Sequence, residues 1–175
     1  MRVRREESAV LVVDYQEKLL PAMCENEKLL ERVQILLTGL RELEIPMIVT
    51  QQYTKGLGMT VKGIQDVVGN DFIEKIRFSA YEDVKEQIKG KKYIIVCGIE
   101  AHICVLQTVI DLKEAGIIPV LVTDCVSSRK KQDMEMAFER AKAEGAVLTT
   151  YEAILFELLE KAGSDTSKKI QRLIR

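Results

Sequence analysis

The sequence predicts an α/β fold in which helices cover both faces of a parallel sheet. Short apolar runs rich in β-branched residues recur along the 175-residue chain and are typical of buried strands. Longer segments whose apolar residues follow a helical period lie between these runs. Regular alternation of strand and helix is the pattern of a parallel sheet. No linker or internal repeat divides the chain, so residues 1–175 are expected to form one domain.

Six segments are predicted to be strands, because each is a short apolar run bounded by charged, glycine or turn residues. They span residues 8–13, 45–50, 71–77, 93–97, 117–123 and 146–149. The first, SAVLVV, is continuous and is expected to be buried. The fifth contains Pro119, which has no backbone N–H, so this strand is expected to be distorted or to lie at an edge.

Six segments are predicted to be helices from their apolar periodicity, and glycines end three of them. They span residues 27–43, 84–88, 103–115, 132–144, 152–162 and 164–175. The last helix is expected to pack on another subunit of a homo-oligomer. Residues 51–60 and 124–129 are expected to be loops that follow the second and fifth strands.

Composition excludes several functional classes. Hydrophobic residues make up 47% of the chain and charged residues 30%, which indicates a globular and not a disordered protein. With 26 basic and 27 acidic residues, no broad basic surface is expected, and no nucleic-acid partner. No apolar run approaches the roughly 20 residues of a membrane span. The first residues lack the pattern of a secretory signal, so a cytoplasmic location is expected.

Cysteine and histidine usage predicts that the chain holds no metal or other cofactor. The four cysteines are not spaced as paired metal-binding motifs, and they are expected to stay reduced in the cytoplasm. His102 is the only histidine, which argues against a histidine-built zinc site. It also argues against a Cys–His or Ser–His–Asp mechanism unless His102 itself is the base.

Cys104 is the foremost candidate nucleophile. It lies just past the strand at 93–97, in the expected first turn of the helix at 103–115. Unpaired N–H groups and the helix dipole favour a thiolate there and could hold an oxyanion. The alternative is that Cys104 is a small buried apolar residue. Cys24, Cys97 and Cys125 lack the helix-start context.

Other polar residues are expected at the same carboxyl edge of the sheet, where open α/β sheets bind ligands. Asp14 ends the first strand and Lys75 lies near the end of the third. Asp14 has the alternative of a helix-cap or loop role, and Lys75 that of a solvated charge. The loop at 51–60 either lines a pocket, with Gln51 or Gln52 and Tyr53 pointing inward, or is an ordinary surface loop.

The chain resembles the isochorismatase-like cysteine hydrolases, a superfamily that includes nicotinamidase and N-carbamoylsarcosine amidohydrolase. It most resembles the branch of isochorismatase domain-containing proteins. The resemblance rests on VVDYQ with Asp14, EKIRFSAY with Lys75 and GIEAHICV with Cys104, supported by DCVSSR and TQQYTKGLGMT, in order over residues 8 to 159. It implies a three-layer α/β/α sandwich on a six-stranded parallel sheet (Rossmann-like), usually oligomeric.

The resemblance implies a catalytic triad of Asp14, Lys75 and Cys104. Cys104 would be the nucleophile, Asp14 would take and return its proton, and Lys75 would keep the thiolate and carboxylate ionised. Lys75 and the helix terminus would acidify the thiol. The family also places a cis peptide at Ile99–Glu100, which would direct the N–H groups of Glu100 and Cys104 to one oxyanion hole.

Two departures limit what the resemblance implies about the substrate. Nicotinamidases hold a metal with an Asp and two His residues, which this chain cannot supply with His102 alone. Glu100 stands where relatives often have a small residue or threonine. It would reject anionic substrates, recognise an amine, or only support the loop. His102 either contacts the substrate or has a capping or loop role.

These observations lead to three hypotheses of function. The first is a hydrolase of a small-molecule amide or related C–N bond that acts through a thioester. Gln51, Tyr53, Phe78 and Tyr81 are its further candidate pocket residues, beside His102. The second is a catalytically inactive or non-amide-specific small-molecule-binding member of the same fold. The third, a redox role for Cys104, lacks a partner cysteine at C-x-x-C spacing.

Overall fold

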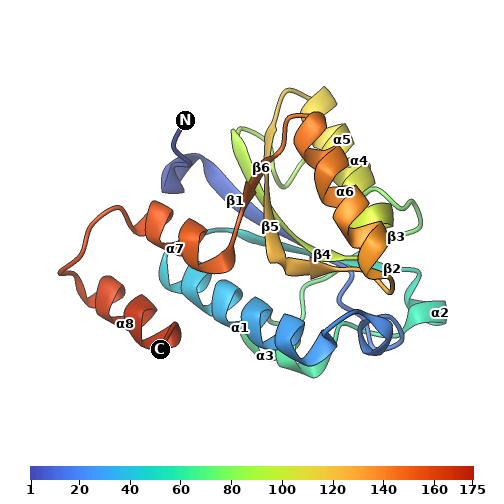
Figure 1. The fold of residues 1–175 in the computed structure, drawn as a ribbon, viewed down its shortest axis with the longest axis horizontal. Coiled ribbons are helices and arrows are strands. Elements are labelled where there is room, and N and C mark those ends of the chain that lie inside the picture. The colour runs from blue at the N-terminus through green and yellow to red at the C-terminus, as the bar shows by residue number, and fades with distance from the viewer.

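A computed structural model describes residues 1–175 and confirms the expected α/β fold (Figure 1). Six strands form one parallel sheet in the order β3-β2-β1-β4-β5-β6. They are β1 (Ser8–Val13), β2 (Met47–Gln52), β3 (Ile73–Lys75), β4 (Tyr93–Ile99), β5 (Ile118–Ser127) and β6 (Val147–Thr149). The order reverses between β1 and β4, which is where ligands bind in open α/β sheets.

Helices cover both faces of the sheet and complete a three-layer sandwich (Figure 1). The helices are α1 (Asn26–Glu42), α2 (Thr54–Leu57), α3 (Lys62–Val68), α4 (Tyr81–Val84), α5 (Leu106–Glu114), α6 (Lys131–Ala143), α7 (Tyr151–Leu159) and α8 (Asp165–Leu173). Short 3₁₀ turns span Arg5–Glu7 and Leu20–Ala22, and a π-helical turn, Ala101–Val105, precedes α5. No helix of the structure is both long and apolar enough to cross a membrane.

Each face of the sheet contributes to its own core. Alternate residues of a strand point to opposite faces. Val10 and Val12 therefore pack in a lower core, below the sheet in Figure 1, while Ala9 and Leu11 pack in an upper core above it. Helices α1, α3, α7 and α8 close the lower core, and α4, α5 and α6 close the upper core. The leucines of α1 that predicted a helix are the buried ones, because their period matches one helix face.

Several element boundaries differ from those predicted, chiefly at the carboxyl edge. Strand β2 includes Gln51 and Gln52, and β5 continues to Ser127 through residues predicted to be a loop. Polar residues continue these strands because neighbouring strands still pair with them there, including Gln52 with Lys75. The third strand covers only Ile73–Lys75 of its predicted 71–77, and β4 continues to Ile99, past its predicted end at residue 97.

Pro119 lies in a strand that has neighbours on both sides, so the expectation of an edge strand is wrong. Ile118 donates its N–H to Lys92 of the β4 side, so the next residue faces β6. Strand β6 pairs with β5 only from Val120 onward. The missing N–H of Pro119 therefore faces a stretch where β5 has no partner to satisfy.

The final helix packs on its own chain. Ile170 of α8 is fully buried in the lower core with α1. Lys169 also pairs with Glu42 of α1, at 2.8 Å between Nζ and Oε2. Figure 1 shows α8 after a long connection, at the end of the molecule away from α2.

Gly98 brings β4 close to β1 at the edge that carries the candidate site. Its φ of +153° is one that side chains rarely adopt, and an added Cβ would lie 2.5 Å from the carbonyl oxygen of Val13. The register between β4 and β5 shifts at the same point. The peptide bond between Ile99 and Glu100 is cis, at the position that the resemblance implied.

Replacing Gly98 with alanine is expected to reduce the free energy of unfolding by at least about 3 kcal/mol, since both the backbone conformation and the contact with Val13 are unfavourable. Urea denaturation measures it. Gly116→Ala is the matched control, because Gly116 has φ +78° but no atom within 4 Å of an added Cβ. The control should lose only about 1 kcal/mol. Equal losses in the two variants would contradict the role assigned to Val13.

Candidate functional site

Asp14, Lys75 and Cys104 come together at the carboxyl edge of the sheet. Asp14 follows β1, Lys75 ends β3, and Cys104 lies in the π-helical turn that follows β4. Strand β2 separates β3 from β1, so the Lys75 side chain reaches across two strand spacings, about 10 Å, to Asp14. The structure thus places the three residues of the implied triad in one polar cluster within a largely apolar surrounding.

Asp14 and Lys75 form an ion pair that is completely buried. Lys75 Nζ lies 2.7 Å from Asp14 Oδ2, and neither side chain is exposed. Asp14 has φ +55°, a left-handed conformation that aspartate tolerates better than most residues. Its other oxygen, Oδ1, accepts a hydrogen bond from Thr50 Oγ1 at 2.8 Å. Thr50 belongs to β2, so the carboxylate is held between two neighbouring strands.

The Lys75 ammonium has three further oxygen partners. Its Nζ donates to Gln52 Oε1 at 2.5 Å, to the Phe78 carbonyl at 2.8 Å and to the Arg77 carbonyl at 3.1 Å. With Asp14 Oδ2 at 2.7 Å, the ammonium therefore has four oxygen neighbours for its three N–H donors. Asp14 also interacts with the Cys104 thiol through a side-chain hydrogen bond, so the carboxylate lies beside the candidate nucleophile.

Cys104 is nearly buried, with 6% of the residue exposed. Burial and then the Asp14 charge raise the pKa of its thiol to about 12, and Lys75 offsets only part of this rise. The expectation of an acidified thiol is therefore wrong for this arrangement. The reason is that Asp14 lies close enough to oppose a second negative charge, while burial disfavours any thiolate.

The pKa of Asp14 is also raised by burial, and it is lowered by Lys75 and by hydrogen bonds from Thr50 and Cys104. The resting site thus combines a carboxylate, an ammonium and a neutral thiol. A carboxylate whose pKa lies above its usual value is a stronger base near neutral pH. The arrangement can move one proton from sulfur to Asp14 when a reactant arrives.

Glu100 is held by Arg129. Arg129 Nε lies 3.1 Å from both carboxylate oxygens of Glu100, and the Arg129 backbone N–H donates to Oε2 at 3.1 Å. The pair joins the turn that carries Cys104 to the segment after β5. Of the three roles expected for Glu100, the structure favours support of the loop.

His102 also contacts the segment that follows β5. Its Nδ1 lies 2.9 Å from Ser128 Oγ, and its Nε2 lies 3.9 Å from Asp133 of α6. These contacts connect His102 to the segment after β5 and to α6, which favours the capping or loop role.

The remaining candidate pocket residues differ in their surroundings. Gln51 accepts two hydrogen bonds from Thr60, through the backbone N–H and the hydroxyl, and so secures the following segment. Tyr53 and Phe78 are half exposed at the rim. Tyr81 borders a shallow depression with Asp111 and Glu114, which lie toward the far end of α5 from Cys104.

Several residues that shape the site were missed from the sequence. Gln52 was named only as an alternative to Gln51, yet it is the one that holds Lys75. Gln16 lies in the VVDYQ motif, and its side chain bonds to both the N–H and the C=O of Gln52. Thr108 and Arg129 were also missed. Position in a motif was the only signal for Gln16 and Arg129.

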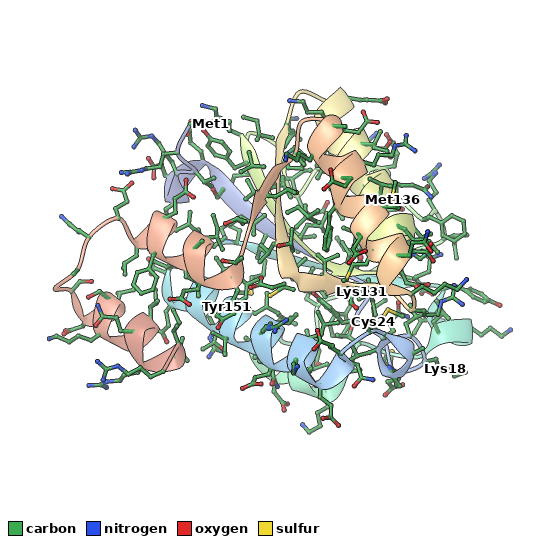
Figure 2. The ribbon with its side chains drawn as sticks, in the orientation of Figure 1. Met1, Lys18, Cys24, Lys131, Met136 and Tyr151 are labelled. Atoms are coloured by element: carbon green, nitrogen blue, oxygen red, sulfur yellow. The ribbon has the colours of Figure 1, made fainter.

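The other cysteines lie outside the cluster. Cys97 and Cys125 are buried strand residues, and burial raises the pKa of both thiols. Cys24 is partly exposed, and its thiol donates to the Arg129 carbonyl at 3.3 Å. Figure 2 shows the Cys24 and Lys131 labels close together, Lys131 being the first residue of α6. No group of three His, Cys, Asp or Glu side chains is arranged to hold a metal ion.

Comparison with known proteins identifies the family of this chain. A family model described as the isochorismatase domain matches residues 8–153. Isochorismatase domain-containing protein 2 of Danio rerio is 36% identical, over 99% of this chain and 89% of that protein. The secreted isochorismatase effector Isc1 of Phytophthora sojae is 32% identical, over 96% of this chain and 84% of that protein.

Solved structures agree with this assignment. The MAR1 ribonuclease of Caenorhabditis elegans has a TM-score of 0.94 and 36% identity, over 99% of this chain and 92% of that one. The YcaC gene product of Escherichia coli, described as an octameric hydrolase of unknown specificity, has a TM-score of 0.87 and 26% identity. The match covers 92% of this chain and 83% of the Escherichia coli chain. With the matched domain, the fold and these relatives together, the chain belongs to the isochorismatase family, and this membership supports a hydrolase-like function.

Proposed function

We propose that this protein is a cysteine hydrolase that cleaves a small amide or related C–N bond through a thioester. The observation that carries the proposal is the buried Asp14–Lys75 pair, whose carboxylate lies within hydrogen-bonding reach of the Cys104 thiol. A buried ion pair often contributes little to stability compared with apolar residues of similar volume, so its presence beside a nucleophile indicates a functional purpose.

In the first half of the reaction, Asp14 Oδ2 takes the thiol proton as Cys104 Sγ attacks the substrate carbonyl carbon. The backbone N–H groups of Glu100 and Cys104 are the proposed donors to the resulting oxyanion. Lys75 keeps Asp14 ionised beforehand and offsets the charge that develops on sulfur. The C–N bond then breaks, the nitrogen receives the proton from Asp14, and ammonia or an amine leaves.

In the second half, water resolves the thioester. Asp14 takes a proton from the water as its oxygen attacks the acyl carbon, and the C–S bond breaks. The proton then returns to sulfur, which restores the neutral thiol. One carboxylate serves both halves because it is the base before each attack and the acid after it. This cycle requires no metal or other cofactor.

Three further matters remain proposals. A homo-oligomer is supported by the octameric relative of Escherichia coli. A cytoplasmic location stays a prediction, since one relative is described as secreted. The ribonuclease relative raises RNA as a substrate, but the net charge of −1 and the nearly buried Cys104 favour a small neutral reactant.

The test of the proposed function is ammonia release from a panel of small amides, ureas and carbamoyl compounds, with single-stranded RNA included as a competing substrate. The wild type is expected to release ammonia from at least one compound, and Cys104→Ala is expected to release none while retaining its circular dichroism spectrum. Cys97→Ala is the control, because Cys97 is buried in the core below the sheet. Release that persists in Cys104→Ala would overturn the mechanism, and RNA cleavage lost with Cys104 would redirect it.

The raised pKa of Cys104 predicts a characteristic alkylation profile. The thiolate fraction should rise about tenfold per pH unit, without a plateau between pH 6 and roughly 10, because the thiol pKa is about 12. Iodoacetamide labelling of a Cys24→Ser background, followed by intact mass, measures the rate at Cys104. The background removes the partly exposed cysteine. A plateau near pH 7 would show a preformed thiolate and contradict the neutral resting thiol.

Asp14→Asn is expected to separate reactivity from catalysis. Asparagine keeps the tolerated left-handed backbone but removes the charge that raises the pKa of Cys104, while three neutral oxygens still hold Lys75. Alkylation of Cys104 at pH 7.5 should therefore accelerate at least about tenfold. Hydrolysis should fall by about 100-fold or more, because the base is lost. Slower alkylation would contradict the electrostatic role assigned to Asp14.

A further inference from the structure

Thr108 makes two buried hydrogen bonds that connect both sides of the site. Its Oγ1 donates to the carbonyl oxygen of Cys104 at 2.7 Å and accepts from the backbone N–H of Ala80 at 2.9 Å. Thr108 and Ala80 are both completely buried. A single hydroxyl therefore joins the turn that carries the nucleophile to the segment that follows β3.

The segment around Ala80 also holds the lysine. Two residues before Ala80, the Phe78 carbonyl accepts a hydrogen bond from Lys75 Nζ at 2.8 Å, and Arg77 contributes a second carbonyl. Strand β3 ends at Lys75 and has only β2 as a neighbour, so beyond it the segment is held by the burial of Ala80 and Val84 in one core and by hydrogen bonds. The bond from Ala80 to Thr108 is a direct polar link between the segment that holds Lys75 and the helix that follows the Cys104 turn.

The Cys104 turn also needs an external support. It is a π-helical turn, in which Val105 donates to the Glu100 carbonyl five residues back. Such turns are rare and are often found at functional sites. Thr108 lies one helical turn after Cys104, where a hydroxyl can bond back to the carbonyl four residues earlier. The oxygen of the same hydroxyl can still accept a hydrogen bond, and it accepts one from the Ala80 N–H.

We infer that Thr108 is a positioning residue that holds the Cys104 thiol against Asp14 by tying its turn to the lysine segment. This inference rests on the proposed function and assigns Thr108 no contact with substrate. Loss of the hydroxyl would leave the Ala80 N–H buried without an acceptor and release the turn on one side. The thiol would then move relative to Asp14, and the two groups would no longer influence each other as strongly.

The test is a double-mutant cycle on Cys104 alkylation, again in the Cys24→Ser background. It compares the acceleration caused by Asp14→Asn at pH 7.5 in three proteins: the background itself, Thr108→Val and Thr108→Ser. Valine has the shape of threonine without the hydroxyl, and serine keeps the hydroxyl. Thr123→Val is the matched control, since its hydroxyl donates only to Thr149 in the β5–β6 pair. If Thr108→Val does not fold, Thr108→Ala takes its place.

Asp14→Asn should accelerate alkylation about tenfold or more in the background and in Thr108→Ser, but less than about threefold in Thr108→Val. Thr123→Val should preserve the full acceleration. The same acceleration in Thr108→Val and in the background would overturn the inference while leaving the triad intact. No acceleration in the background itself would remove the proposed triad, and the role of Thr108 with it.

Discussion

The site depends on one buried ion pair. Asp14 and Lys75 are both removed from water, and each would be unfavourable there without the other. Much of the local structure serves this pair. Thr50 fixes one carboxylate oxygen, and Gln52 with two backbone carbonyls fixes the ammonium. A carboxylate oxygen can accept more than one hydrogen bond, so Asp14 keeps acceptor capacity for the cysteine beside its contacts with Lys75 and Thr50.

This arrangement explains how a carboxylate can serve as the base for a thiol. A free carboxylate is ordinarily too weak, since the two groups differ widely in pKa. Here burial raises the pKa of Asp14, while the thiol stays neutral until a carbonyl is present to accept its electrons. Proton transfer and attack are then parts of one step. The cysteine is also protected, because a neutral buried thiol is oxidised and alkylated slowly.

The sheet could be predicted from the sequence because its elements follow from local signals, whereas the meeting of three polar residues at its carboxyl edge was implied by the family resemblance. Apolar runs identify strands, helical periods identify helices, and three motifs placed Asp14, Lys75 and Cys104 at strand ends. The supporting bonds could not be predicted in the same way. Whether Gln51 or Gln52 faces Lys75 depends on the strand continuing two residues further than its apolar run. Arg129 meets Glu100 only because β5 extends to Ser127, where its polar sequence indicated a loop.

The role of Thr108 could not be predicted from the sequence either. Helical periodicity gives no reason to single out this polar residue, because its partner Ala80 is distant in sequence and follows an edge strand. Among the roles expected for Glu100 and His102, the structure favours those that support the loop. Both residues lie beside Cys104 in sequence, yet their bonds are to Arg129 and Ser128, which only the folded chain brings near.

The shortness of β3 affects the order in which the candidate site and the sheet come apart on denaturation. Strand β3 has three residues, lies at the edge of the sheet and pairs with β2 alone. Protein structures open locally where pairing is sparse, at free energies below that of global unfolding. The lysine half of the site belongs to such a region, whereas Asp14 and Cys104 adjoin the two central strands. Mild denaturation should thus detach Lys75 first, so that the proposed activity would be lost while the sheet and both cores are still folded.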